Sequence, residues 1–166
     1  GGYIDKFTDA LMELSYTGLT HQVWATAAMV LGESIDVSAV GSTTTPIYIE
    51  GRTSDGSANP QGANRPTITC GANTFSLANH WWLKDLIFTS TEASGVRVKF
   101  AALVRNCKFS NMSETADRVA LTVGGNVVRL IDCECDSAAG YGVSDPNTTM
   151  VRMVANYIHD SKIGVL

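Results

Sequence analysis

The chain has 166 residues, of which 45% are apolar, and a formal net charge of −4 from 12 basic and 16 acidic side chains. This size and apolar content predict one domain with a substantial buried core. The acidic balance argues against a nucleic-acid partner, and the lack of an apolar run of roughly 20 residues argues against membrane insertion.

The first part of the chain, residues 1–19, predicts a short capping α-helix. Its apolar residues recur at helical spacing: Tyr3, Phe7, Ala10, Leu11 and Leu14. In front of a repeat array, such a helix would cover the open end of the first coil. The last residues, 163–166, have the pattern of another strand, so we expect further coils in a longer parent protein.

Residues 20–80 predict irregular opening coils. Short alternating runs rich in β-branched and aromatic residues cover 21–25, 35–37 and 47–50. The stretch 51–65 is rich in Gly, Ser, Asn, Pro and Asp, and we predict a long surface loop there.

Residues 81–166 predict regular coils, because one motif recurs along them. An aliphatic residue stands two positions before an Asp or Asn, and a residue suited to a core stands one position after it. The aligned residues are Asp85, Asn106, Asp132 and Asn156, at separations of 21, 26 and 24 residues. This is the period of a solenoid.

The alternation of inward and outward side chains resets at each aligned Asp or Asn, so the chain must bend there. Asn and Asp tolerate the left-handed conformation and bond nearby backbone groups, so we expect the four residues to stack as a ladder along the bend. The predicted inward residues before the bend are Leu83, Val104, Leu130 and Val154. Those after it are Leu86, Cys107, Cys133 and Tyr157, followed two residues later by Phe88, Phe109, Cys135 and His159.

Four cysteines are present at positions 70, 107, 133 and 135. Cys133 and Cys135 lie on one face of a predicted strand, and Cys107 takes the position of Cys133 one coil earlier. We interpret them as small buried hydrophobic residues, with a disulfide or a zinc site as the alternative.

Three short β-runs per coil, an Asn-bearing bend with aliphatic residues before it, and an amphipathic helix in front resemble the right-handed parallel β-helix, or pectate-lyase-like, superfamily. Segments 2–11, 32–37 and 46–51 also resemble the entry segments of such proteins. The resemblance implies an all-β, right-handed single-stranded parallel β-helix solenoid with a short N-terminal capping α-helix, incomplete at its C-terminus. Phage tailspikes, polysaccharide lyases and hydrolases, and surface adhesins share this fold, so it also implies an extracellular or virion-associated location.

Enzymes of this superfamily use clustered aspartates that hold calcium, or paired carboxylates as acid and base. The nearest cluster in this chain is Asp132, Glu134 and Asp136. We assign Asp132 to the bend and interpret Glu134 as an outward partner of Lys108, with a metal or acid–base site as the alternative. We therefore predict no catalytic residue, metal site or cofactor here, and calcium only if the parent is a lyase.

A glycan-binding surface is predicted around Arg97 and Lys99, on an outward strand face, together with Asp117, Arg118 and Asp145 on adjacent loops. An ordinary solvated surface is the alternative, since any exposed β-sheet needs charge.

A second outward stripe is partly apolar. It comprises Trp82, Leu103, Arg129 and Met153, three positions before the ladder, with Ile87 and Ile158 outward after it. Such a face predicts self-association, for example as a homotrimer, or cover by a loop of the same chain. His80, beside Trp81 and Trp82, is interpreted as a packing residue.

These observations favour a non-catalytic structural or host-surface and glycan-binding module of a phage tail, virion appendage or adhesin. The alternative is the N-terminal part of a secreted polysaccharide lyase or glycoside hydrolase whose catalytic coils lie beyond Leu166.

Overall fold

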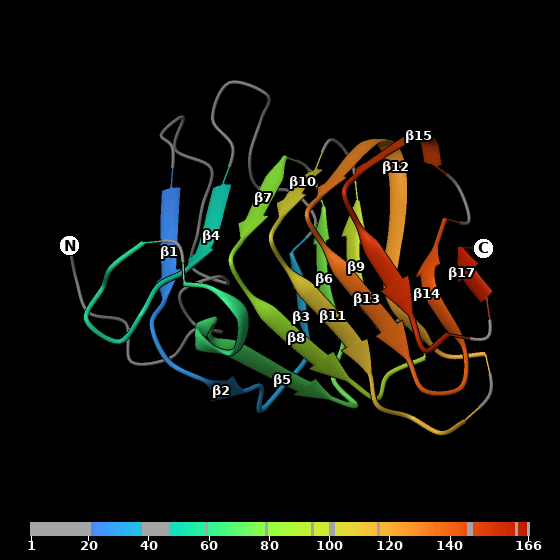
Figure 1. The fold of residues 1–166 in the computed structure, drawn as a ribbon, viewed down its shortest axis with the longest axis horizontal. Coiled ribbons are helices and arrows are strands. Elements are labelled where there is room, and N and C mark those ends of the chain that lie inside the picture. Colours follow the sequence, from blue (N-terminus) through green and yellow to red (C-terminus); the bar gives the residue numbers. More distant parts are fainter. Residues whose placement is uncertain are drawn as a thin grey trace.

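The computed structural model describes residues 21–37, 47–58, 60–78, 80–93, 95–99, 102–115, 117–145, 148–161 and 163–165. These residues form an all-β parallel solenoid, as predicted, in which the chain advances along the long axis from β1 to β17 (Figure 1). The predicted capping helix, 1–19, lies outside the described residues. No helix among the described residues has the length and apolar character needed to cross a membrane.

Three parallel sheets make up the walls of the solenoid. Sheet A stacks β1 (His21–Ala25), β4 (Ile47–Gly51), β7 (Trp81–Lys84), β10 (Ala102–Arg105), the second half of β12 (Val119–Ile131) and β15 (Thr148–Val154). Sheet B stacks β2 (Met29–Val30), β5 (Thr67–Gly71), β8 (Ile87–Ser90), β11 (Lys108–Asn111), β13 (Glu134–Ser137) and β16 (Tyr157–His159). Sheet C stacks β3 (Ile35–Val37), β6 (Phe75–Ala78), β9 (Val96–Lys99), the first half of β12, β14 (Tyr141–Ser144) and β17 (Ile163–Val165). The short 3-10 helix η1 (Gly62–Asn64) lies between β4 and β5.

The core consists of inward side chains stacked from coil to coil. Phe88 packs between Phe75 and Phe109, with ring centroids 5.1 and 5.3 Å apart, and the rings of Phe88 and Phe109 are parallel within 5°. Because like residues in adjacent strands lie about 4.8 Å apart, an in-register aromatic stack fills the interior without gaps. Each phenylalanine is fully buried.

The four cysteines are buried and free, as the interpretation of them as core residues predicts. Burial raises the pKa of Cys70 to about 12 and that of Cys133 to about 11. These thiols therefore stay neutral and behave as small apolar groups.

The bend between sheets A and B is built on left-handed residues. Asp85, Asn106 and Asp132 have φ angles of 58°, 48° and 53°, and the Asn106 amide donates a 2.6 Å hydrogen bond to Oδ1 of Asp85 in the coil before it. These three predicted ladder residues therefore stack at the bend. Their side chains satisfy one another where the backbone leaves the sheet.

The prediction is wrong for the last coil, where the register differs by one residue. Val154 pairs with Ile131, so the left-handed residue beneath Asp132 is Ala155, with a φ of 53°, and not Asn156. Asn156 instead lies level with Cys133, accepting a 2.8 Å hydrogen bond from its backbone N–H and donating one of 2.9 Å to the carbonyl of Leu130. Asn156 still holds the bend, but from a different position.

A slip of one residue exchanges the two faces of a strand, because side chains alternate with a period of two. Val154 and Tyr157, predicted to point inward, are 50% and 65% exposed. Met153 and Ile158, predicted to point outward, pack against the core. His159, predicted to point inward, lies level with outward Asp136.

A second polar column stabilises the bend between sheets B and C. Ser90, Asn111 and Ser137 are in register and buried, and the Asn111 amide donates hydrogen bonds to the carbonyls of Val119 (2.7 Å) and Glu92 (2.8 Å). The third corner differs, because β12 runs through it as one strand of 13 residues and turns at Gly125, where φ is 87°.

Candidate functional site

The outer face of sheet A carries a groove of about 400 Å³, which we call the aromatic groove. Its walls come from β1, β4, β7 and β10, which lie side by side in Figure 1. The parallel register stacks Gln22, Tyr48, Trp82 and Leu103 in one outward column, and Trp24, Glu50, Lys84 and Arg105 in the next.

Three aromatic rings line the groove. Trp24 is 54% exposed and Trp82 is 36% exposed, and the rings of Tyr48 and Trp82 meet edge to face with centroids 4.8 Å apart. The guanidinium of Arg52 lies 4.5 Å from the centre of the Trp24 ring, within the range of a cation–π contact. Partly exposed, fixed aromatic rings are typical of surfaces that bind ligands with both apolar and polar faces.

A chain of charges crosses the groove. The Glu50 carboxylate accepts hydrogen bonds from Nη2 of Arg52 at 2.6 Å and from Nζ of Lys84 at 2.9 Å, and Lys84 also lies 3.2 Å from Oδ2 of Asp85. Partial burial acts to raise the pKa of Glu50, but the bonds from Lys84 and Arg52 outweigh it and the pKa lies below its usual value. An ionised Glu50 orients donors and accepts hydrogen bonds, so it suits binding better than proton donation.

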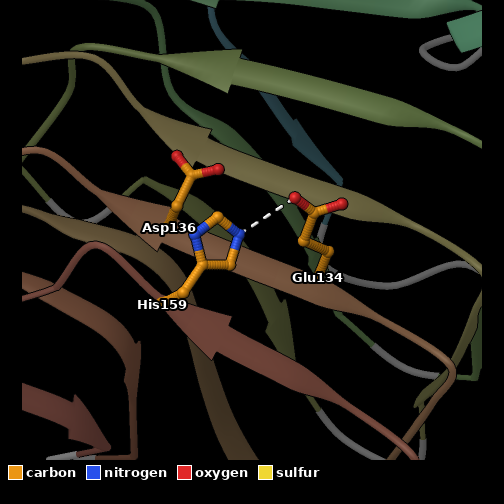
Figure 2. Close-up of side chains that lie close together, drawn as sticks. All are labelled: Glu134, Asp136 and His159. Atoms are coloured by element: carbon orange, nitrogen blue, oxygen red, sulfur yellow. Dashed lines mark hydrogen bonds and ion pairs between the residues drawn. The ribbon is translucent and has the colours of Figure 1, made fainter. Parts of the chain in front are cut away.

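A second cluster of charges lies on the outer face of sheet B, and we call it the ion cluster. It comprises Lys108 from β11, Glu134 and Asp136 from β13, and His159 from β16. Nζ of Lys108 lies 2.8 Å from Glu134 and 3.2 Å from Asp136, and Nε2 of His159 lies 2.9 Å from Glu134. Figure 2 shows His159 directed toward Glu134, with Asp136 beside it.

The pKa shifts in the ion cluster follow from these pairs. The hydrogen bond to Glu134 raises the pKa of Lys108 despite partial burial, while burial acts to raise the pKa of Glu134 but is outweighed by Lys108 and His159, which lower it. Bonds to Asp160 first, and to Glu134 second, raise the pKa of His159. Each member therefore favours its charged form, and the cluster links three successive coils.

Glu134, Asp136 and His159 offer ligand atoms within 4.8 Å of one another, so a metal ion must be considered. The Lys108 ammonium already contacts both carboxylates, and Oγ of Ser110 donates a 3.0 Å hydrogen bond to Asp136. A cation would have to displace Lys108, and calcium would need more oxygen ligands than these two carboxylates supply. The contacts fit the predicted cross-strand ion pair between Glu134 and Lys108 better than a metal site.

The residues of the predicted glycan surface lie along sheet C. Arg97 and Lys99 are on β9, Asp117 and Arg118 precede β12, and Asp145 follows β14. Nη2 of Arg97 lies 3.5 Å from Glu92, and Asp117 accepts a 3.3 Å hydrogen bond from the hydroxyl of Tyr141. Glycan binding at these residues stays a prediction.

The predicted apolar stripe is only partly outward. Trp82 and Leu103 stack in register on the outer face of sheet A, but the position predicted for Met153 belongs to Arg152. Tyr48 and Trp24 lengthen the stripe towards the N-terminal coils. The sequence pattern contained this signal, since Trp24 and Tyr48 alternate with inward residues. Their coils could not be aligned because 34 residues separate Tyr48 from Trp82.

Comparison of the chain with protein-family models, with curated proteins and with solved structures found no match. A functional assignment must therefore come from the geometry of the chain itself.

Proposed function

We propose that this chain is a non-catalytic, glycan-binding module of a phage tail, virion appendage or surface adhesin, acting outside the cell or on a virion. The observation that carries the proposal is the aromatic groove, which combines exposed flat rings with an ordered set of charged hydrogen-bonding groups. Sugar rings present apolar C–H faces and hydroxyl edges, and a groove of this composition complements both.

The arrangement supports binding rather than reaction. Glu50 is held ionised by two cations, and the carboxylates of the ion cluster are likewise paired with Lys108 and His159. A general acid for glycoside hydrolysis needs a raised pKa, whereas the pKa values of Glu50 and Glu134 are lowered.

The test is a glycan panel followed by titration of each hit by tryptophan fluorescence. A double substitution, Trp24→Ala with Trp82→Ala, should weaken binding at least about tenfold, because it removes both exposed indoles. Tyr157→Ala is the matched control, since Tyr157 is an exposed aromatic on sheet B, outside the groove. Equal loss in the control, or a panel without any bound glycan, would refute the proposal.

Self-association through the same face is the second candidate, favoured by exposed apolar side chains near the stripe, Met150 and Val154. Sedimentation of the free protein tests it. A concentration-dependent trimer that Trp82→Asp abolishes would favour this function over glycan binding, and a monomer at all concentrations would exclude it.

A further inference from the structure

The outward column that begins in the aromatic groove continues into stacked arginines. Arg129 lies level with Leu103 in the next coil, and Arg152 lies level with Arg129 in the coil after that. Arg105, at the edge of the groove, lies two positions along from Leu103 on the same face. We call Arg105, Arg129 and Arg152 the arginine patch.

The charges of this patch are poorly compensated within the protein. Arg129 and Arg152 are exposed, and neither has a hydrogen-bond or ion-pair partner in the part of the chain that the structure describes. Nε of Arg105 lies 4.0 Å from Oδ2 of Asp132, at the limit of an ion pair, and both side chains are at least half exposed. Like charges in register on adjacent strands repel one another, so the chain retains an arrangement that disfavours its own folding.

The patch is also opposite in sign to the whole chain, whose net charge is −4. Elsewhere on the outer surface the cations are matched from coil to coil, as Lys84 is by Glu50 and Lys108 by Glu134. A local positive field attracts anions, and the planar guanidinium group binds carboxylate and sulfate oxygens in a bidentate manner.

We infer that the aromatic groove and the arginine patch form one site for an acidic polysaccharide that lies across the stacked coils, parallel to the solenoid axis. Sugar rings contact Trp24, Tyr48 and Trp82, and carboxylate or sulfate groups further along the chain contact Arg105, Arg129 and Arg152. From Trp82 to Arg152 the column crosses three strand spacings, or about 14 Å. The inference rests on the proposed function and adds the ligand's charge and direction.

The experiment titrates the protein with three oligosaccharides of equal length. Alginate fragments carry carboxylates, carrageenan fragments carry sulfate esters, and agarose fragments are neutral. Both acidic probes, or one of them, should bind more tightly than agarose, with an affinity that falls as salt is raised. Preference for alginate or for carrageenan identifies which anionic group the patch accepts.

The decisive variant is the pair Arg129→Gln and Arg152→Gln. It should weaken binding of the acidic probe about tenfold and leave agarose binding unchanged, because each lost ion pair contributes a modest share. It should also leave the protein as stable as before or slightly more so, since it relieves repulsion. Arg118→Gln, on the sheet C side, is the control and should leave binding unchanged.

Several results would overturn the inference. If agarose binds as tightly as both acidic probes at every salt concentration, the glycan-binding function stands but the acidic ligand does not. If Arg118→Gln weakens binding and the double variant does not, the site lies on sheet C. If an oligothymidylate probe binds more tightly than either acidic glycan, the patch recognises nucleic acid. If neither acidic probe binds although the glycan panel gives neutral hits, only the inference fails; if the panel gives none, the proposed function fails too.

Discussion

The outer faces of sheets A and B share the same coils and strand spacing, yet they treat charge in opposite ways. On sheet B, Lys108, Glu134 and His159 are paired across three coils. On sheet A, the pairs of Glu50 lie beside exposed indoles, and the column ends in Arg129 and Arg152 without partners among the described residues. The comparison teaches that a surface whose charges are satisfied internally serves the fold, whereas unsatisfied charge beside exposed aromatic rings indicates a ligand.

The largest effect is expected in the core that supports both faces. Phe88→Ala should lower the free energy of unfolding by about 3–5 kcal/mol, because it removes the middle ring of the Phe75, Phe88 and Phe109 stack. Chemical denaturation measures this loss. Thr89→Ala, one residue further on the outward side of the same strand, should change stability by less than about 0.5 kcal/mol, and equal losses would contradict a shared core.

A matched pair of substitutions separates the two faces. Glu50→Gln and Lys108→Met each break a partly buried, coil-to-coil ion pair, so each should cost about 1–2 kcal/mol of stability by denaturation. Only Glu50→Gln should also weaken glycan binding, because it releases Arg52 and Lys84 within the groove. If Lys108→Met weakens binding equally, the distinction between the faces fails.

The bend that divides the two faces should become more stable when Ala155 is replaced by glycine. Ala155 has a φ of 53°, which costs energy for a residue with a Cβ atom, so Ala155→Gly should stabilise the protein by about 0.5–1 kcal/mol. The neighbouring Asn156→Ala should destabilise it, because the bonds to Cys133 and Leu130 are lost. Thermal unfolding of both variants checks these opposite signs, and destabilisation by Ala155→Gly would contradict the register described here.

The smallest effect is a pH dependence confined to sheet B. The pKa of His159 is raised above its ordinary 6.5, so its stabilising contribution is complete below pH 6.5 and is lost as the pH rises through the raised pKa. The groups that face His159 are Glu134, Asp160, Lys108, Asp136 and the stacked ring of Tyr157, of which only the imidazole titrates near neutrality.

Denaturation between about pH 6 and pH 8 should therefore show a loss of about 0.5 kcal/mol that His159→Gln abolishes. Glycan affinity should stay constant over this range, because the pKa of Glu50 is lowered and that of Lys84 is raised, away from neutrality. An affinity that follows the pH would show that the two faces are coupled.

The solenoid and the middle ladder could be predicted because two signals agree there. Asp85, Asn106 and Asp132 fall at regular separations, and the inward residues on both sides of them are apolar. In the last coil the signals diverge: Asn156 attracted the alignment, while the left-handed position is taken by Ala155, a residue type that gives no sign of a bend. The exposed Val154 and Tyr157 follow from that single slip.

The aromatic groove could be predicted only in part. Trp82 was recognised as outward, but Trp24 and Tyr48 belong to opening coils whose separations, 26 residues from Trp24 to Glu50 and 34 from Glu50 to Lys84, depart from the later repeats. The position of Arg52 over Trp24 depends on the course of the loop after β4, which no periodicity specifies. Ladder positions follow from local geometry, whereas surface neighbours depend on register between coils.

The unbroken course of β12 bears on how the molecule withstands force. This strand bonds to β9 and β14 through its first half and to β10 and β15 through its second, so it joins two walls of the solenoid at one corner. A solenoid held only by neighbouring coils can peel from either end, one coil after another. Tension applied along the axis should meet its greatest resistance where β12 turns that corner, and the amide hydrogens there should be the last to exchange with solvent.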